Sequence, residues 1–196
     1  QYLIDQWKEQ GIYDDIRNGT IHIIWTGGEP TIKGHQEAIV NFTRYWIEQG
    51  DDYFRKVIQS NEIVQGPFYE IETNGTVYIE DDLFNLLAQI NCSPKLSNSG
   101  MEEKRRIVPE AIERIKQHVN YQFKFVISTE DDIKEMFHDF VEPFNIPLKN
   151  VVCMPGLDSQ TDFHERTQFV MEMAKKYKFR GMSRMHISAW DKTLNV

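Results

Sequence analysis

The strongest constraint on the fold of this chain is a regular alternation of short β-type runs with longer helical patterns. The β-type runs lie at 21–26, 68–73, 86–90, 121–128, 150–154 and 183–188, and the helical patterns at 36–49, 108–119, 131–140 and 162–177. Alternation of this kind indicates parallel strands joined by crossover helices. Six strands predict an α/β fold, a partial (βα)6-type TIM barrel of parallel strands, with residues 1–196 as a single domain. A full eightfold barrel needs about 250 residues.

Charge and cysteine content narrow the possible functions. The 22 basic and 30 acidic residues leave a net charge of −8, which argues against nucleic acid as a partner. The sequence contains no apolar run near 18 residues, so we expect no membrane partner. The two cysteines, Cys92 and Cys153, lie far apart, and each is interpreted as a small buried side chain rather than part of a disulfide framework. A cytoplasmic location is the expectation.

Polar side chains follow the predicted strands. In parallel α/β folds, ligands bind at the carboxyl ends of the strands, so these residues are expected to share one edge. Gly27 and Gly28 leave the backbone open to close approach by a ligand, and Glu29, expected at this open rim, can accept from an ammonium group. Together, the polar residues that follow the predicted strands suit a zwitterionic small molecule. The runs are 26–30 (TGGEP), 72–76 (ETNGT), 93–95 (SPK), 128–129 (ST) and 154–158 (MPGLD), followed by His186 and Trp190.

The TGGEP run resembles the methionine-binding motif of radical S-adenosylmethionine enzymes. Together with ETNGT, SPK and the late Arg184-Met185-His186-Ile187 run, it makes the chain from Ile21 onward resemble the 7-carboxy-7-deazaguanine synthases. The resemblance implies that a [4Fe–4S] cluster and S-adenosylmethionine generate a 5′-deoxyadenosyl radical. That radical starts the conversion of 6-carboxy-5,6,7,8-tetrahydropterin to 7-carboxy-7-deazaguanine, a Mg²⁺-assisted lyase reaction that releases ammonia and belongs to queuosine and 7-deazapurine biosynthesis.

The resemblance also implies roles for individual residues. Thr26 and His186 would face the pterin substrate. A flavodoxin-type reductant and a homodimer would be the protein partners, and the basic residues 175, 176, 178, 180 and 184 could dock such an acidic reductant. The residues expected to hold S-adenosylmethionine are Gly27, Gly28, Glu29, Glu72, Asn74, Ser93 and Lys95.

The cluster is where the sequence departs from the family. Three cysteines of an N-terminal loop ligate the family's cluster, and a threonine of that loop binds Mg²⁺. Only Cys92 and Cys153 are present here. We expect the first strand and the cluster loop to be missing from these 196 residues, because the helical pattern of Tyr2, Ile4 and Trp7 starts without a capping residue. The competing explanation is a protein that has lost catalysis.

Two alternatives to the synthase stay open. Another short-barrel radical S-adenosylmethionine enzyme, such as an activase of a glycyl-radical enzyme, would share TGGEP but would not require SPK or the late histidine. A non-catalytic binding protein would keep the barrel without the cluster. The acidic pairs at 51–52, 81–82 and 131–132 are expected to open helices rather than form acid–base sites.

Overall fold

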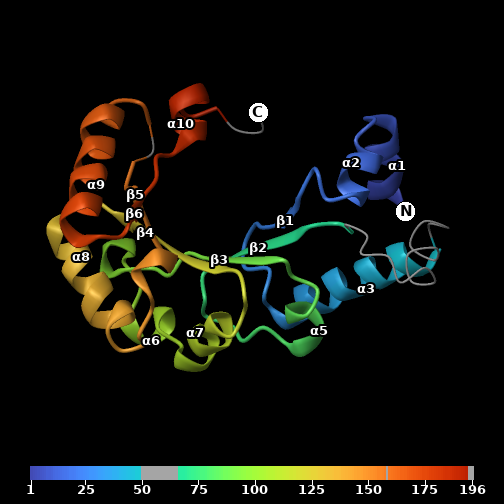
Figure 1. Cartoon of the computed structure of the whole chain (residues 1–196), viewed down its shortest axis with the longest axis horizontal. Coiled ribbons are helices and arrows are strands. Elements are labelled where there is room, and N and C mark those ends of the chain that lie inside the picture. Colours follow the sequence, from blue (N-terminus) through green and yellow to red (C-terminus); the bar gives the residue numbers. More distant parts are fainter. Residues whose placement is uncertain (50–65, 158, 194–196) are drawn as a thin grey trace. The chain divides into compact units, whose positions relative to one another are not determined.

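The computed structural model describes residues 1–49, 66–157 and 159–193 (Figure 1). The acidic pair at 51–52 lies outside these ranges. The strands are β1 (Ile23–Trp25), β2 (Tyr69–Thr73), β3 (Gln89–Cys92), β4 (Tyr121–Ile127), β5 (Val151–Pro155) and β6 (Arg180–Gly181). The α-helices are α1 (Tyr2–Glu9), α2 (Tyr13–Arg17), α3 (Lys33–Gln49), α5 (Asp81–Phe84), α6 (Glu103–Arg106), α7 (Pro109–Lys116), α8 (Glu130–Met136), α9 (Phe163–Tyr177) and α10 (Met185–Trp190). Shorter helical segments are η1 (Ser97–Ser99), the π-helical η2 (Phe137–Val141) and η3 (Leu148–Asn150).

The predicted fold class is confirmed. Six strands of the described chain form one sheet whose order follows the chain from β1 to β6. The pairs β1–β2, β4–β5 and β5–β6 are parallel, as a partial barrel requires. The chain divides into two compact units. The first unit comprises Gln1–Glu72 and Ile79–Ile90, and the second comprises Thr73–Tyr78 and Asn91–Val196. The single-domain assignment stays a prediction.

An aromatic cluster forms the core of the first unit. Trp46 of α3 is fully buried, and its ring lies 5.4 Å from that of Trp7 on α1 and 6.5 Å from that of Tyr69 on β2. Trp46 Nε1 also donates a 3.1 Å hydrogen bond to the hydroxyl of Tyr13, so the buried indole N–H is satisfied. This cluster joins α1, α2 and α3 to the strands that carry the first predicted motif.

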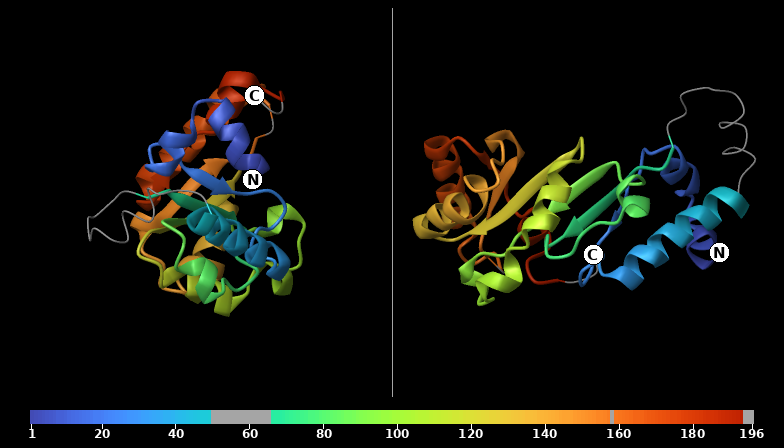
Figure 2. Two further views of the ribbon diagram at one scale, coloured as in Figure 1. Left: turned by 90° about the vertical axis from the view of Figure 1, so that its right-hand side faces the viewer. Right: turned by 90° about the horizontal axis from the view of Figure 1, so that it is seen from below.

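Side-chain alternation along β4 organises the second unit. Phe123, Phe125 and Ile127 are buried, whereas Lys124 and Val126 between them are half-buried. Helix α8 packs on β4, and α9 packs on β5 and β6. Figure 2 shows α8 and α9 beside these strands from two further directions. The face of β4 that carries Phe123, Phe125 and Ile127 therefore belongs to the core. The opposite face carries the polar residues of the strand.

The acidic pairs within the described chain open helices, as predicted. Asp81 and Asp82 lie in the first turn of α5. Helix α8 begins with a capping box, in which the Thr129 hydroxyl accepts from Asp132 N at 3.3 Å and the Asp132 carboxylate accepts from Thr129 N at 2.9 Å. These bonds satisfy backbone N–H groups that a helix start leaves without partners.

The predicted sixth strand at 183–188 is wrong. The last strand is the two-residue β6, which pairs with Val152 and Cys153, and the ladder ends with a bond from Met182 N to Cys153 O. Residues 185–190 instead form α10, in which Ser188 N bonds Arg184 O at 3.1 Å. Backbone groups that bond within the segment cannot also extend the ladder.

The third strand lies further along the chain than the predicted range 86–90. Leu86 N and Leu87 N bond carbonyls of Leu83 and Phe84, so both residues complete the turn that ends α5. Strand β3 starts at Gln89.

None of the described helices is long and apolar enough to cross a membrane.

Candidate cofactor-binding site

In the first unit, the turn between β1 and α3 has an open backbone. Gly27 and Gly28 adopt φ values of +88° and +57°, which side-chain-bearing residues rarely adopt. A Cβ built on either glycine would meet nothing within 4 Å, so packing does not explain the two glycines. Thr26, just before them, is exposed. A ligand could therefore approach the main chain at this turn.

Glu29 differs from the expectation of a carboxylate at an open rim. Glu29 is 8% exposed, and its Oε1 accepts hydrogen bonds from Thr31 N at 3.0 Å and from the Thr31 hydroxyl at 2.6 Å. The carboxylate thus stabilises the turn at 29–31 that leads into α3, in addition to any role in binding. Sequence reasoning missed this structural role, although a threonine two residues after an acid is a signal for such a turn.

Glu72 is the other predicted site residue of the first unit. It lies on β2, where buried Ile71 and Thr73 flank it, and it is exposed. The parallel register pairs Trp25 of β1 with Ile71. Consequently, the carboxyl ends of β1 and β2, which carry Thr26 and Glu72, lie side by side.

In the second unit, a tight turn brings Asn74 close to Ser93. Ser93 N donates to Thr73 O at 2.7 Å, while Asn74 Oδ1 accepts from Thr76 N at 2.9 Å and from its hydroxyl at 2.6 Å. Gly75 at φ +75° completes the turn, and a Cβ there would lie 2.6 Å from Cys92 Sγ. The glycine of the ETNGT run is therefore required by the buried cysteine.

Ser93 and Lys95 line one cavity of about 300 Å³. None of the nine residues that line it carries a negative charge, and two of them are lysines. Such a cavity favours an anionic group, for example a carboxylate. The lining residues are Ser93, Pro94, Lys95, Leu96, Asn98, Ser99, Lys124, Val126 and Ser128.

Lys124 is a cavity residue that sequence reasoning missed. The available signal was its position between Phe123 and Phe125, because alternation along β4 turns a residue between two core positions toward the opposite face. Ser128, which follows β4, meets the end of β5, since a Cβ on Gly156 would lie 2.2 Å from Ser128 Oγ. The predicted 154–158 run thus approaches this cavity, although residue 158 lies outside the described ranges.

His186 does not lie at a strand end. It is an exposed residue of α10, and Arg184 precedes that helix with Nη1 bonded to Leu157 O at 2.6 Å. The bond ties the start of α10 to the loop after β5. A pterin contact by His186 would therefore come from a helix rather than from the predicted strand.

The residues of this chain do not fit the cluster that the family resemblance implies. A cluster that leaves one iron open needs three thiolates, and the sequence has two cysteines. Both are fully buried, and burial raises the pKa of the Cys153 thiol, which disfavours the thiolate. Among the described residues, no three His, Cys, Asp or Glu side chains gather as a metal site. Taken separately, the glycine turn of the first unit leaves the main chain open to a ligand, and the lysine-lined cavity of the second unit favours an anionic group.

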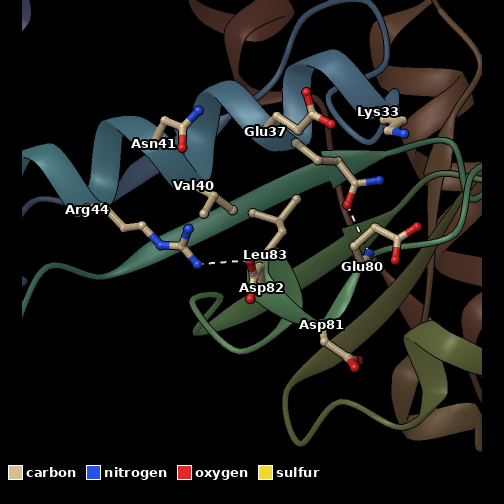
Figure 3. A pocket seen from close by; sticks show the side chains of 10 residues that line it. Lys33, Glu37, Val40, Asn41, Arg44, Glu80, Asp81, Asp82 and Leu83 are labelled. Atoms are coloured by element: carbon tan, nitrogen blue, oxygen red, sulfur yellow. Dashed lines mark hydrogen bonds and ion pairs between the residues drawn. The ribbon is translucent and has the colours of Figure 1, made fainter.

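A larger cavity of about 550 Å³ lies between α3 and α5 in the first unit. Its wall contains both charges, and Arg44 Nη2 bonds Asp82 Oδ2 at 2.8 Å across it (Figure 3). The buried Gln36 also accepts from Glu80 N at 2.9 Å. None of the predicted site residues lines this cavity, so it is not the candidate site.

Comparison with known proteins confirms the resemblance. No protein-family model matches the chain. The chain is 30% identical over 169 residues to 7-carboxy-7-deazaguanine synthase of Pyrobaculum aerophilum, a match that covers 86% of this chain and 65% of that protein. It also superposes on the crystal structure of QueE from Escherichia coli with a TM-score of 0.52 and 18% identity, covering 93% of this chain and 61% of the other. The second match supports the fold alone.

Proposed function

We propose that the chain belongs to the 7-carboxy-7-deazaguanine synthases, lyases of the radical S-adenosylmethionine family, and takes part in converting 6-carboxy-5,6,7,8-tetrahydropterin to 7-carboxy-7-deazaguanine. The observation that carries the proposal is the 30% identity over 86% of the chain. The proposal assigns to these 196 residues the binding of S-adenosylmethionine and pterin. It does not assign to them the [4Fe–4S] cluster or Mg²⁺.

Each predicted site residue would contact the part of the cofactor that suits its own chemistry. The open backbone at Gly27 and Gly28 would receive the methionine amino group, with Glu29 supplying negative charge nearby. Lys95 would hold the methionine carboxylate as a charged hydrogen-bond donor. Glu72, Asn74 and Ser93 would contact the remaining polar groups, and Thr26 and His186 the pterin.

Titration calorimetry with S-adenosylmethionine tests the binding part. We expect the unchanged chain to bind and Lys95→Ala to lose about 1.5–3 kcal/mol, the contribution of a hydrogen bond to a charged group. Lys175→Ala is the matched control, because that lysine lies exposed on α9 and pairs with Glu172 at 2.9 Å. Absence of binding by the unchanged chain would refute the proposal.

The lyase step is tested on the protein expressed from its full-length gene, reconstituted anaerobically with iron and sulfide and assayed for conversion of the tetrahydropterin to the deazaguanine product and ammonia. The two buried cysteines favour a second candidate, a protein that binds the ligands without catalysis. A full-length protein that binds S-adenosylmethionine but neither retains cluster iron nor converts the pterin would support this candidate over the synthase. A glycyl-radical activase would instead leave the pterin unbound.

The proposed protein partners rest on charge and on the resemblance. An acidic flavodoxin-type reductant would dock at the basic residues near the end of α9. Lys175 and Lys176 already pair with Glu172 and Glu130, which reduces the charge available to a partner. Homodimer formation likewise stays a prediction.

A further inference from the structure

A buried arginine lies at the centre of an ion-pair network behind the Lys95 cavity. The Arg106 side chain is 6% exposed, and Nη2 lies 2.9 Å from Glu135 Oε1 while Nη1 lies 3.2 Å from Asp139 Oδ2. Both carboxylates are largely buried on α8 and η2. Charges paired in this way inside a protein hold their partners in a narrow range of positions, since separating them leaves a buried charge uncompensated.

Glu135 extends the network to the loop that carries Lys95. Its Oε1 accepts from Ser97 N at 2.7 Å, and its Oε2 accepts from the Ser97 hydroxyl at 2.5 Å. One carboxylate thus bonds the buried guanidinium on one side and two donors of Ser97 on the other. The loop is thereby tied to α8, an element 38 residues further along the chain.

Lys95 itself lies between two buried residues. Pro94 is buried, and Leu96 is 2% exposed, whereas Lys95 is exposed and lines the cavity. Asn98 Nδ2 adds a bond to Val126 O at 3.3 Å. The backbone on both sides of Lys95 is therefore fixed in position by buried neighbours and by hydrogen bonds of the loop. The direction of the lysine side chain depends on these contacts.

We propose that Glu135, held by Arg106, is a positioning residue that aligns Lys95 for the carboxylate of S-adenosylmethionine through its two bonds to Ser97. This inference rests on the proposed function, because it assumes that Lys95 binds that carboxylate. Glu135 and Arg106 act through the loop and touch no ligand themselves. Neither residue belongs to the motifs that carry the family resemblance.

Ser97→Ala removes one of the two loop bonds without disturbing the buried ion pairs. We expect it to weaken binding of S-adenosylmethionine by about three- to tenfold in titration calorimetry of the full chain, the range of an ordinary hydrogen bond. Glu135→Gln, which removes the charge from both bonds, should weaken binding by at least as much. Ser159→Ala is the matched control, because this half-buried serine bonds the Thr161 hydroxyl and does not line the Lys95 cavity.

A second ligand separates positioning from general loss of structure. 5′-Methylthioadenosine lacks the methionine carboxylate, so its affinity should stay within about twofold in Ser97→Ala and Glu135→Gln. Equal losses for both ligands would overturn the proposal. In a Lys95→Ala background, Ser97→Ala should cost no further affinity for S-adenosylmethionine, since contacting residues that act together are not additive.

The outcomes distinguish this inference from the proposed function. If Lys95→Ala weakens S-adenosylmethionine binding and Ser97→Ala does not, only the inference fails. If the unchanged chain binds no S-adenosylmethionine, both fail. Hydrogen exchange without ligand provides a separate measurement: residues 95–99 should exchange faster in Glu135→Gln than in the unchanged chain, and equal exchange would overturn the proposal.

Discussion

At the scale of single residues, the turn after β1 depends on backbone conformations that favour glycine. Gly27 and Gly28 have positive φ values and open space where a Cβ would stand. Backbone strain, rather than a steric clash, is therefore the reason that other residues would be costly there. The same open space makes the turn accessible to a ligand.

Gly28→Ala should destabilise the chain by about 1 kcal/mol, because alanine at φ +57° is strained. Urea unfolding monitored by circular dichroism measures this cost. Gly34→Ala is the control, since Gly34 lies in α3 with nothing within 4 Å of a Cβ and without a positive φ. It should leave the stability unchanged or raise it by up to about 1 kcal/mol. A Gly28→Ala chain as stable as the unchanged one would contradict the strain argument.

Glu29→Ala should also destabilise the chain, by about 1–3 kcal/mol, because Thr31 N and the Thr31 hydroxyl would lose their acceptor in a buried place. An exposed carboxylate at an open rim, the position expected from the sequence, would support no core, and its removal would cost little stability. Unfolding of Glu29→Ala beside Glu37→Ala, an exposed glutamate of α3, decides between the two expectations. Equal stabilities of the two variants would restore the sequence-based view.

At the scale of elements, α8 connects the β4 edge of the cavity to the Lys95 loop. It begins two residues after Ser128, which lines the cavity, and it carries Glu135 about one and a half turns later. The position of the first turn of α8 therefore affects both Ser128 and Glu135. The capping box at Thr129 specifies where that turn begins.

Thr129→Ala should lower the free energy of unfolding by about 1 kcal/mol, the ordinary cost of losing an N-cap side chain. Thr20→Ala is a fair control, because Thr20 is exposed and its bond to Asn18 Oδ1 uses only its backbone N–H. It should change stability by less than about 0.5 kcal/mol. An equal effect of the two substitutions, measured by urea unfolding, would mean that the cap contributes nothing.

At the scale of the whole molecule, a buried tyrosine links stability to pH. Burial raises the pKa of Tyr69 to about 12, against the smaller opposite effect of a hydrogen bond with Thr43. The phenol thus keeps its proton in the folded state at pH values where the unfolded chain, with a pKa near 10, releases it. Between pH 10 and 12 the folded state binds more protons, so stability must fall as the pH rises through this window.

The free energy of unfolding should therefore decrease between pH 10 and pH 12, and Tyr69→Phe should make this decrease shallower. Urea unfolding at several pH values measures both slopes. Absorbance titration of the folded chain provides an independent measure, because the raised pKa of Tyr69 delays its phenolate to a higher pH than in the unfolded chain. Identical pH slopes of the two chains would exclude Tyr69 as their cause.

The sequence by itself determined the fold class, and it proposed the residues of the candidate site. Hydrophobic periodicity and turn residues act locally, so strands β1, β2, β4 and β5 and the start of α8 were predicted within a few residues. The motif residues Ser93 and Lys95 were likewise found from their place after a strand. These features depend on neighbours in the chain, which the sequence contains explicitly.

Only the tertiary structure decided what those residues contact. The burial of Glu29, the cavity beside Lys124 and the bonds from Glu135 to Ser97 depend on segments distant along the chain. So does the bond from Arg184 to Leu157 O, which ties the start of the helix that carries His186. Met185 and Ile187 alternate with polar residues as they would in a half-buried strand, yet the ladder on β5 ends at Met182. Whether a polar group is exposed, paired or buried is a property of packing, and packing is set by all the elements together.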